Sequence, residues 1–569
     1  MRNDLVFFKI KLPSIIKYFF IILFLLTSVT KLISQNINCD LMLNPEDLMI
    51  DGEGTIFPGD TICLLAGPKN YLFLKNIHGT EEEPVVIINK DGQVVIDTDH
   101  YFGIKFDGCS FVKLSGNGLD AYQYGILVSR VENGAGISVD NKSTNIEIEY
   151  IEISNTSIGG IYAKTEPDPY GDCTFPAVRS KFTMYNTIIH DNYLHDIADE
   201  GMYIGSSKYT GQYIYNCDTT VLPHVLIGVK VYNNILENTG WDGIQVSSAV
   251  SDCEIYGNYI IGDSYAEEEY QMSGILIGGG SNCDCYNNRI EDGKGDGIDV
   301  FGLGNQKIYN NLIINPGKTY FPGGDPTIHP KHGIYVGHVS TIENAGYYFY
   351  NNTIIKPKTT GIRFANTYSY GNKIINNIIT EPGAFSEYGD DSFINISDPS
   401  INITISNNLK SNDLNTIKFD DPIVGNYDLQ LGSPAINSGM NLATEEINFD
   451  ILNRFRPFAA FFDIGAYECH KPGASIGEIS LQNNYIQLKE NRPNPFSDNT
   501  IIEFFIPKKA RVELLVFNSI GVLVKEVTNE IIEAGNHKVK FDSENLSQGI
   551  YYFKLKAFGK SLTKKMIIL

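Results

Sequence analysis

The sequence predicts an all-β protein: a right-handed parallel β-helix of about ten coils, followed by a small C-terminal β-sandwich. Two repeated motifs lead to this fold class. A Gly-apolar-x-apolar pattern returns along the chain, and an Asn followed by a short apolar run returns between its copies. No comparable helical spacing occurs, and the abundance of Gly (53 residues) and Tyr (34 residues) suits turns and strands rather than helices.

The N-terminal residues 1–34 are predicted to be a signal peptide. Lys9, Lys11 and Lys17 precede an apolar run, residues 18–29, that is short for a bilayer span. Cleavage is expected near the sequence LISQ, and an uncleaved anchor is the alternative.

Nine cysteines are scattered along the chain without the spacing of a zinc site. In an exported protein some of them are expected to form disulfides. Cys173 and Cys217 flank a long segment that a disulfide could close.

The repeat itself defines one coil. The glycine motif begins at residues 125, 160, 201, 243, 274, 297, 333 and 361, and several Asn-to-Gly steps, such as Asn234 to Gly243, are nine residues long. Longer steps contain loops, as is typical of a solenoid. Strands this short must lie on the next coil to bury their apolar side chains, and the Asn amides are expected to form a ladder from coil to coil.

This pattern resembles the pectate-lyase-type β-helix proteins, whose members mostly bind or cut polysaccharides. Residues 57–89 resemble the first coils of such proteins, and residues 427–441 with 454–468 resemble a terminal coil of secreted bacterial members. We expect that terminal segment to cap the open end, because an unpaired last strand invites aggregation. The β-helix domain is placed at residues 35–470, followed by a linker at 471–487.

Residues 488–569 are predicted to form a separate Ig-like β-sandwich of about six or seven short strands. The order P-N-P-F, N-x-x-G-x-x-V, L-x-x-G-x-Y and a final T-K-K-M-I-I-L closely resembles the C-terminal sorting domain of the type IX secretion system. The resemblance implies a Bacteroidetes-type bacterium and a secreted or cell-surface protein, exported by the general secretory pathway and then by the type IX machinery. A generic adhesive sandwich is the alternative.

Stacking aligns equivalent positions of successive coils into columns. With rungs about 4.8 Å apart, Glu200 and Asp242 are expected about 5 Å apart, and Asp242 and Asp296 about 10 Å apart. Stacked carboxylates repel unless one holds a proton or a cation lies between them. The column therefore predicts an acid–base site or a calcium site with Glu200 and Asp199 as ligands; ordinary Asp-Gly turn chemistry is the alternative. Before the glycine the column contains Glu200, Asp242, Ser273, Asp296, His332 and Thr360, and the outward column two residues after the glycine contains Tyr203, Gln245, Leu276, Asp299, Tyr335 and Arg363.

Two long insertions, residues 259–273 and 312–332, border these columns and are expected to form the walls of a groove. Both contain aromatic residues that can stack on sugar rings. Trp241 lies beside Asp242 at the expected lip, and simple packing is its alternative role.

Charge narrows the class of ligand. The net charge of −23 argues against a nucleic-acid partner, because phosphate binding needs a basic surface. A local basic excess indicates instead a polyanionic ligand such as a uronate or sulfated glycan; the alternative is a counter-charge for the acidic loop 263–269. The basic residues of this segment are Lys318, His329, Lys331, His332, His338, Lys356, Lys358 and Arg363.

Three segments, 295–300, 331–338 and 361–366, resemble motifs of polygalacturonase-type glycosidases in the same order. The resemblance implies that Asp296 is an acid or base, that His332 orients it, and that Arg363 holds a substrate carboxylate. The hydrolase set is incomplete, because the family's Asn-Thr-Asp motif is missing and the chain departs from its pattern at Gly295, Lys331 and Phe364-Ala365.

We therefore predict a secreted, monomeric enzyme that degrades an acidic polysaccharide, with no membrane span after signal removal. Hydrolysis would use Asp242, Asp296 or Asp299 as acid and base. β-Elimination would use Lys331, His332, Tyr335 or Arg363, with calcium on Glu200 and Asp242. The predicted substrate-binding residues are Arg363, Tyr335, Gln245, Trp241 and His338. The rival interpretation is a non-catalytic glycan-binding or adhesive surface protein, which needs no convergent acid and base.

Overall fold

The structure is a computed structural model that describes residues 37–322, 329–385, 392–459, 461–471, 486–489, 491–506, 508–518, 523–543, 546–558 and 560–568. The predicted signal peptide and its cleavage site lie outside the described residues. The chain divides into two compact units, Met1–Ala474 and Ser475–Leu569. No helix in the described ranges combines the length and the apolar character needed to cross a bilayer.

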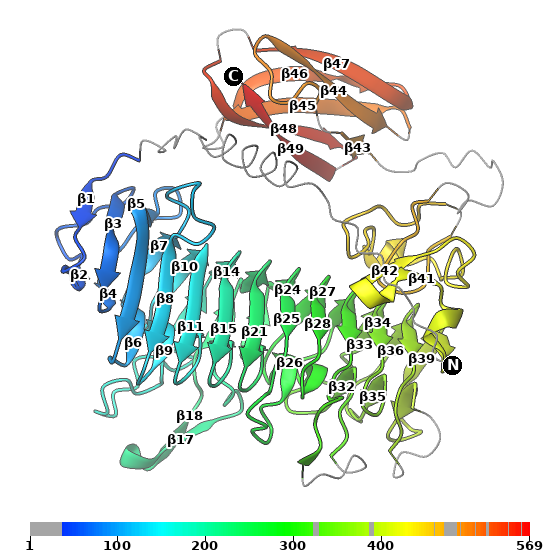
Figure 1. The fold of residues 1–569 in the computed structure, drawn as a ribbon, viewed down its shortest axis with the longest axis horizontal. Coiled ribbons are helices and arrows are strands. Elements are labelled where there is room, and N and C mark those ends of the chain that lie inside the picture. Colours follow the sequence, from blue (N-terminus) through cyan, green and yellow to red (C-terminus); the bar gives the residue numbers. More distant parts are fainter. Residues whose placement is uncertain are drawn as a thin grey trace, which may run out of the picture. The chain divides into compact units, whose positions relative to one another are not determined.

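The first unit contains the predicted parallel β-helix, in which successive coils stack strand on strand (Figure 1). One long sheet has 12 parallel strands, slightly more than the ten coils expected, and it carries the glycine motif. Its strands are β2 (Met49–Asp51), β4 (Leu72–Lys75), β6 (Phe102–Asp107), β9 (Ala135–Asp140), β12 (Ile161–Ala163), β16 (Met202–Ile204), β22 (Ile244–Val246), β26 (Ser273–Ile277), β29 (Asp296–Val300), β32 (Ile334–Val336), β35 (Ile362–Phe364) and β38 (Ile394–Ile396).

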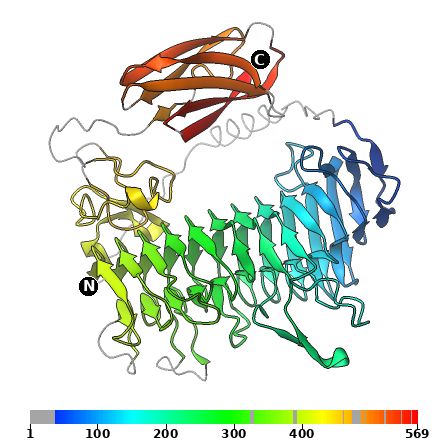
Figure 2. The same cartoon turned by 180° about the vertical axis from the view of Figure 1, so that it is seen from behind.

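The other long sheet has 23 strands, because most coils contribute two of them; Figure 2 shows the stack from behind. One row is β1 (Leu41–Leu43), β3 (Thr61–Lys69), β5 (Val85–Thr98), β7 (Ser110–Ser115), β10 (Thr144–Glu149), β14 (Thr187–His190), β20 (Lys230–Tyr232), β24 (Cys253–Tyr256), β27 (Cys283–Tyr286), β30 (Gln306–Tyr309), β33 (Tyr347–Tyr350), β36 (Asn372–Ile375) and β39 (Ile403–Ser406). The second row starts at β5 and continues with β8 (Ile126–Val131), β11 (Ile151–Thr156), β15 (Tyr193–Ile197), β21 (Ile235–Thr239), β25 (Tyr259–Ile261), β28 (Arg289–Glu291), β31 (Leu312–Ile314), β34 (Thr353–Ile355), β37 (Ile378–Thr380) and β40 (Leu409–Ser411).

The repeated glycine is required by a close approach between coils. A Cβ added at Gly243 would lie 2.6 Å from the carbonyl oxygen of Gly274 on the next coil and 2.9 Å from Cγ2 of Ile260. The equivalent contact at Gly201 would be 2.5 Å. At Gly201 and Gly243 only glycine fits, so the motif helps to fix the register of these strands against their neighbours.

The asparagine pairs serve two purposes. The first member, such as Asn233 with φ of 55°, makes the left-handed turn. The second member, such as Asn234, is buried and donates its Nδ2 to Oδ1 of Asn258 on the next coil, at 3.0 Å. This ladder, expected from the sequence, joins Asn192, Asn234, Asn258, Asn288, Asn311, Asn352, Asn377 and Asn408.

The segment that follows the last coil packs against the side of the helix. Ile417, Tyr427 and Ile464 share one buried cluster with Leu312 and Ile355 of the 23-strand sheet. Strands β31, β34 and β37 are buried at every position, so this segment covers an outward face that is itself apolar. A capping role at the open end stays a prediction. The small elements of this segment are η4 (Leu414–Thr416), β41 (Phe419–Asp421), η5 (Pro422–Val424), β42 (Asn426–Leu429) and η6 (Ala443–Glu445).

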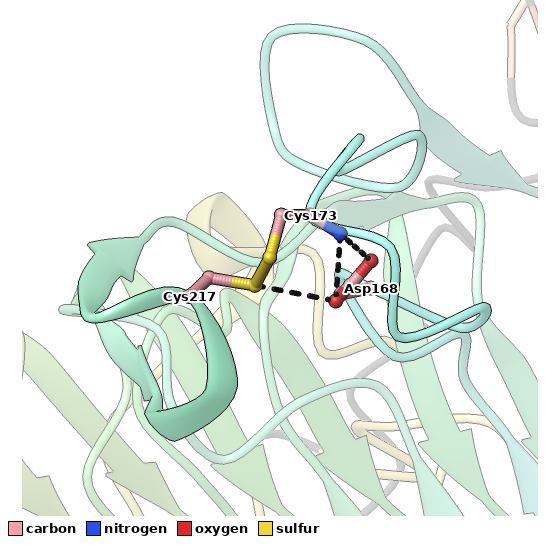
Figure 3. Close-up of side chains that lie close together, drawn as sticks. All are labelled: Asp168, Cys173 and Cys217. Carbon is pink, nitrogen blue, oxygen red and sulfur yellow. Dashed lines mark hydrogen bonds between the residues drawn. A yellow bond between two sulfur atoms is a disulfide. The ribbon is translucent and has the colours of Figure 1, made fainter.

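Two insertions project from the coils that contain β12 and β16. The insertion after β16 contains a hairpin, β17 (Gln212–Ile214) and β18 (Thr219–Val221), with η1 (Tyr215–Cys217) between its strands. A small parallel sheet consists of β13 (Thr183–Tyr185), β19 (Val225–Ile227) and β23 (Ala249–Ser251), and β23 belongs to the coil of β22. A disulfide joins Cys173 to Cys217, as the sequence suggested (Figure 3). Two further disulfides are Cys39–Cys63 and Cys253–Cys283.

The second unit is a sandwich of two antiparallel sheets around its own apolar core. One sheet contains β43 (Gln487–Leu488), β44 (Asn499–Ile506) and β47 (Gly535–Asp542). The other contains β46 (Leu523–Ile532), β45 (Ala510–Asn518), β48 (Gly549–Ala557) and β49 (Lys560–Ile568). Its seven strands agree with the predicted C-terminal sandwich.

Candidate functional site

The strand register confirms both predicted columns. In the outward column, Tyr203 pairs with Gln245, Gln245 with Leu276, Leu276 with Asp299, Asp299 with Tyr335, and Tyr335 with Arg363. In the other column, Ser273 pairs with Asp296. Residues dozens of positions apart in the sequence therefore lie side by side on one face of the 12-strand sheet.

A pocket of about 360 Å³ opens on this face over β29 and β32. It brings together five of the predicted site residues: Asp296, Asp299, Lys331, His332 and Tyr335. Its other lining residues are Glu269, Tyr270, Met272, Phe301, Tyr320, His329 and Pro330, most of which come from the two insertions that were expected to wall a groove. Residues 323–328 of the second insertion lie outside the described residues.

Asp296 is fixed by two charge-assisted contacts at the base of the pocket. Its Oδ2 lies 3.1 Å from Nζ of Lys331, and its Oδ1 accepts the backbone N–H of His332. Both side chains are mostly buried, at 9% and 14% exposure. Burial lowers the pKa of Lys331, but the carboxylates of Asp296 and Asp299 outweigh it and raise that pKa above its usual value. Lys331 is therefore a fixed cation beside the carboxyl group of Asp296.

Asp299 lies three residues further along the same strand and has a different environment. It is half-buried, and within the described residues its Oδ1 has no hydrogen-bond partner. Burial and the negative charge of Asp296 raise the pKa of Asp299 well above its usual range, although Lys331 opposes the shift. One strand thus places two carboxyl groups in one pocket, Asp296 paired with Lys331 and Asp299 with a raised pKa.

His332 is buried beside Asp296, and its Nδ1 lies 3.1 Å from Oγ1 of Thr359. Burial lowers the pKa of His332 to about 4, so the imidazole is neutral near pH 7. Its ring lies nearly parallel to that of Tyr335, with centroids 5.7 Å apart. The pocket wall next to Asp296 is therefore a neutral, aromatic surface.

Asp242 does not reach the pocket. It is 1% exposed, and its Oδ1 accepts the backbone N–H and the hydroxyl of Ser273, each at 2.7 Å. Burial raises the pKa of Asp242 to about 8, with a further contribution from Glu200. Gln245 on the same strand is also 1% exposed. Both were predicted to act on substrate, but in the structure both are buried.

Glu200 and Asp199 were predicted as calcium ligands. Glu200 is buried and accepts the Tyr162 hydroxyl at 2.8 Å, and Asp199 is half-buried. Among the residues that the structure describes, two clusters have three acidic, His or Cys ligand atoms close together, and neither contains Glu200 or Asp199. A calcium site at this position stays a prediction.

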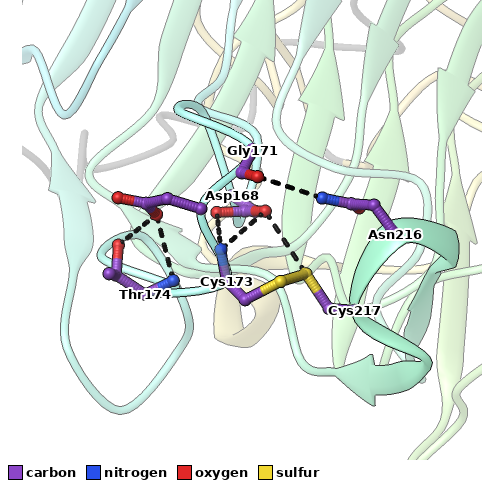
Figure 4. The surroundings of a disulfide bond; sticks show 7 residues. Asp168, Gly171, Cys173, Thr174, Asn216 and Cys217 are labelled. Carbon is purple, nitrogen blue, oxygen red and sulfur yellow. Dashed lines mark hydrogen bonds between the residues drawn. A yellow bond between two sulfur atoms is a disulfide. The ribbon is translucent and has the colours of Figure 1, made fainter.

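In both clusters the possible metal-ligand atoms already have bonding partners within the protein. In one, Cys173 and Cys217 are joined as a disulfide, with Asp168 accepting from the backbone N–H of Cys173 (Figures 3 and 4). In the other, Lys113 forms ion pairs with Glu147 and Glu149, at 2.6 and 2.8 Å, beside His190. Sulfurs in a disulfide are no longer thiolate ligands, and the two glutamates already pair with Lys113 and His190.

Asp263 was missed as a site residue by sequence reasoning. Its carboxyl is 2% exposed and lies in a cradle of glycines: a Cβ added at Gly293 would be 1.9 Å from Oδ2, and the backbone N–H of Gly295 donates to the carboxyl. Burial raises the pKa of Asp263 to about 6, although the nearby Lys331 opposes this. Asp263 therefore holds the turn that leads directly into Asp296. The two glycines at 293 and 295 were the only signal in the sequence.

Arg363, His338 and Trp241, the remaining predicted residues, do not line this pocket. Arg363 lies one coil beyond Tyr335, with Nη1 donating to Asn395 Oδ1. His338 is exposed on the turn after β32, and Trp241 is half-buried at the base of the loop that contains Tyr270, where its carbonyl accepts from Ser264. The three residues belong to different coils, and their contact with substrate stays a prediction.

The basic segment is partly used inside the protein. Lys331 pairs with Asp296, Lys356 with Glu381, and Lys358 donates to the carbonyls of Tyr320 and His329. Lys331 thus serves the counter-charge role that was the alternative interpretation, but toward the column rather than toward the acidic loop.

Comparisons with known proteins agree with the two units. Residues 135–354 match the family described as right handed beta helix region, and residues 492–569 match the secretion system C-terminal sorting domain. Among curated proteins, none matches the chain.

Several solved structures are similar to the chain. An alginate lyase from Paenibacillus sp. str. FPU-7 is 12% identical over 58% of this chain and 99% of its own, with a TM-score of 0.38. A GH136 lacto-N-biosidase from Eubacterium ramulus is 12% identical over 62% of each chain (TM-score 0.34), and the A-module of the Azotobacter vinelandii mannuronan C-5 epimerase AlgE6 is 15% identical over 62% of this chain and 91% of its own (TM-score 0.32). From its strand topology and the two family matches, the chain is a right-handed parallel β-helix protein with a type IX secretion sorting domain, which directs it to the cell surface or the extracellular space.

Proposed function

We propose that this protein is a secreted enzyme that hydrolyses a glycosidic bond of an acidic polysaccharide, with Asp299 as general acid and Asp296 as general base. One observation carries the proposal. A single strand presents two carboxyl groups to one pocket, and Asp296 has the Lys331 cation 3.1 Å away, whereas Oδ1 of Asp299 has no hydrogen-bond partner among the described residues.

Hydrolysis needs a group that donates a proton to the leaving oxygen and a second group that removes a proton from water or attacks the sugar. The two must be protonated and ionised, respectively, at the same pH. Asp299, buried and close to another carboxylate, suits the acid. Asp296, ion-paired and accepting the His332 N–H, suits the base. Its proton would return to Asp299 through solvent between turnovers.

The shape and chemistry around the pocket support a polymeric substrate. The outward column runs from coil to coil, so a chain of sugars laid along it would meet one side chain on each rung. Tyr270, Phe301, Tyr320 and Tyr335 line the pocket and offer apolar faces to pyranose rings. One coil beyond, the guanidinium of Arg363 matches the planar geometry of a sugar carboxylate.

A second candidate is β-elimination, and the neutral state of His332 favours it. An imidazole with a pKa of about 4 is unprotonated near pH 7 and can accept the proton α to a uronate carboxylate. Lys331 and Arg363 would then stabilise the developing charge.

Digestion of uronic, sulfated and neutral polysaccharides by the full-length protein distinguishes these reactions. Hydrolysis releases new reducing ends without new absorbance, whereas β-elimination also creates an unsaturated sugar that absorbs in the near ultraviolet. We expect reducing ends alone, and their loss in Asp296→Asn and Asp299→Asn.

The non-catalytic alternative has its own result. If the protein binds a polysaccharide but produces neither signal, and if both Asp variants bind as tightly as the native protein, it is a glycan-binding protein and the proposed chemistry is wrong.

A further inference from the structure

Two turns bring the rings of His338 and Tyr368 together at the ends of neighbouring strands, β32 and β35. Their centroids are 3.8 Å apart and their planes are inclined by 22°. Yet Tyr368 is 63% exposed, and His338 is also exposed. A stacked aromatic pair left in solvent buries little apolar surface, so it contributes little to the core of the fold.

Asn366 holds the two turns in place. This side chain is fully buried, and its Nδ2 donates to the carbonyl of Gly337 at 2.8 Å and to Oγ1 of Thr341 at 2.7 Å. Its Oδ1 accepts the backbone N–H groups of Tyr368 and Ser369, at 3.0 and 3.1 Å. One amide thus links the turn of His338 to the turn of Tyr368.

The ring of His338 is held as well. Its Nδ1 lies 3.1 Å from Oγ1 of Thr341, which also contacts the hydroxyl of Tyr347 at 2.9 Å. The Tyr347 hydroxyl in turn donates to the carbonyl of Gly302. A buried network that fixes exposed rings is the arrangement of a preorganised binding surface, because it lowers the entropy cost of binding.

The pair lies next to the pocket. A Cβ added at Gly337, the residue before His338, would be 2.3 Å from the ring of Phe301 and 3.1 Å from the ring of Tyr335, both of which line the pocket. The turn that carries His338 therefore leaves the sheet directly against the pocket wall.

We propose that His338 and Tyr368 form a separate carbohydrate-binding subsite, which stacks on the apolar face of a pyranose ring bound next to the sugars in the pocket. The inference rests on the proposed polysaccharide substrate, but not on the reaction. Aromatic rings bind sugar rings through their CH-rich faces, independently of sugar charge, so this subsite would bind neutral and acidic units of the chain alike.

Affinity measurements on the Asp296→Asn protein test the subsite without turnover. Labelled disaccharides and hexasaccharides of uronic, sulfated and neutral sugars serve as probes, and binding is followed by fluorescence anisotropy. In this background we expect Tyr368→Ala to weaken binding of the hexasaccharide about tenfold and to leave the disaccharide unchanged, because only the longer chain reaches both sites. Tyr368→Phe should bind normally.

Tyr370→Ala is the matched control, because Tyr370 lies on the same turn and is 58% exposed. It should bind both probes as the parent does, and melting temperatures of all variants should agree. Equal loss in the Tyr368 and Tyr370 variants, or no loss in Tyr368→Ala, would overturn the subsite and leave the proposed reaction standing. Failure of the parent to bind any probe would instead remove the proposed function together with the subsite.

Discussion

Nζ of Lys331 lies 3.1 Å from Oδ2 of Asp296 across two neighbouring coils, and both side chains are mostly buried. The pair exists because the turn before β32 carries a lysine at the rung next to Asp296. Removing one partner of a buried ion pair leaves the other without its counter-charge, so Lys331 is the partner that Asp296 needs in this pocket.

Lys331→Met should therefore lower kcat by about 100-fold while the protein still folds, since the aliphatic part of the side chain is kept. Steady-state kinetics on the best polysaccharide substrate measures this. Lys318→Met removes an exposed lysine of the same insertion and should leave kcat within about twofold of native. Equal rates for the two variants would remove Lys331 from the site.

Asp299 gives a prediction about pH. Burial and Asp296 raise its pKa, so the proton needed by the leaving group is present at low pH and is lost as pH rises through that raised value. Activity should fall on the alkaline side for this reason. Asp299→Asn keeps the shape but cannot donate the proton, and kcat should fall about 10²- to 10⁴-fold with KM little changed.

An aryl glycoside with a good leaving group checks the assignment, because its departure needs no acid. Relative to the native protein, Asp299→Asn should lose much less activity on such a substrate than on the polysaccharide. A variant impaired equally on both substrates would contradict the role of Asp299 as acid.

The columns could be predicted because the repeated residues fix the register of the strands. Glycine at 243 and asparagine at 234 fix each strand against the next, so counting from the glycine placed Asp296, Asp299 and Tyr335 on one face. The loops that form the walls of the groove do not recur at a fixed spacing in the sequence. A column residue is buried or exposed according to whether a loop covers it, and the repeat does not show this. For this reason Asp242 and Gln245 were predicted to act on substrate, although both are 1% exposed.

Two other features could not be predicted from the sequence, for related reasons. Asp263 reaches the site through a glycine cradle made by another coil, and sequence spacing does not show such a contact. The segment after the last coil packs beside β31 and β34, because the outward faces of these strands are apolar. In both cases a tertiary contact, not a local pattern, decides the position.

Asp242 predicts how stability depends on pH. Its pKa is about 8 in the folded protein, above the ordinary value near 3.8, so the folded state holds a proton that the unfolded state loses. Its stabilising contribution is complete below about pH 4 and disappears as pH rises to about 8. Asp242→Asn imitates the protonated form and should escape this loss.

Melting temperatures across this pH range measure the effect. The variant should match the native protein near pH 4 and be more stable near pH 8, by an amount on the order of a few kcal/mol. Asp252→Asn, on an exposed turn, should show no pH-dependent difference from native. If the difference in stability between Asp242→Asn and the native protein were also independent of pH, the Asp242 carboxyl would titrate normally.

The coils should tolerate a change at the left-handed turn position and not at the ladder position that follows it. Asn258 accepts from Asn234 and donates to Asn288, each at 3.0 Å, so Asn258→Ala leaves buried partners unsatisfied and should cost about 2–4 kcal/mol. Asn233→Gly keeps the left-handed turn and should change stability by less than about 1 kcal/mol. Chemical denaturation compares them, and similar costs for both would argue against the ladder as a source of stability.

Gly295 occupies the place of the second aspartate of polygalacturonase-type enzymes, and restoring that residue should not restore their chemistry. A Cβ at position 295 would lie 2.4 Å from the carbonyl carbon of Met272 and 2.6 Å from the nitrogen of Ser273. Gly295→Asp must therefore displace the start of β26, where Ser273 donates to Asp242. Both Gly295→Asp and Gly295→Ala should lower stability by about 1–3 kcal/mol and reduce turnover, because the clash begins at Cβ. Higher turnover in Gly295→Asp than in Gly295→Ala would show that the site accepts a second aspartate here, and that the close contact with Met272 does not constrain it.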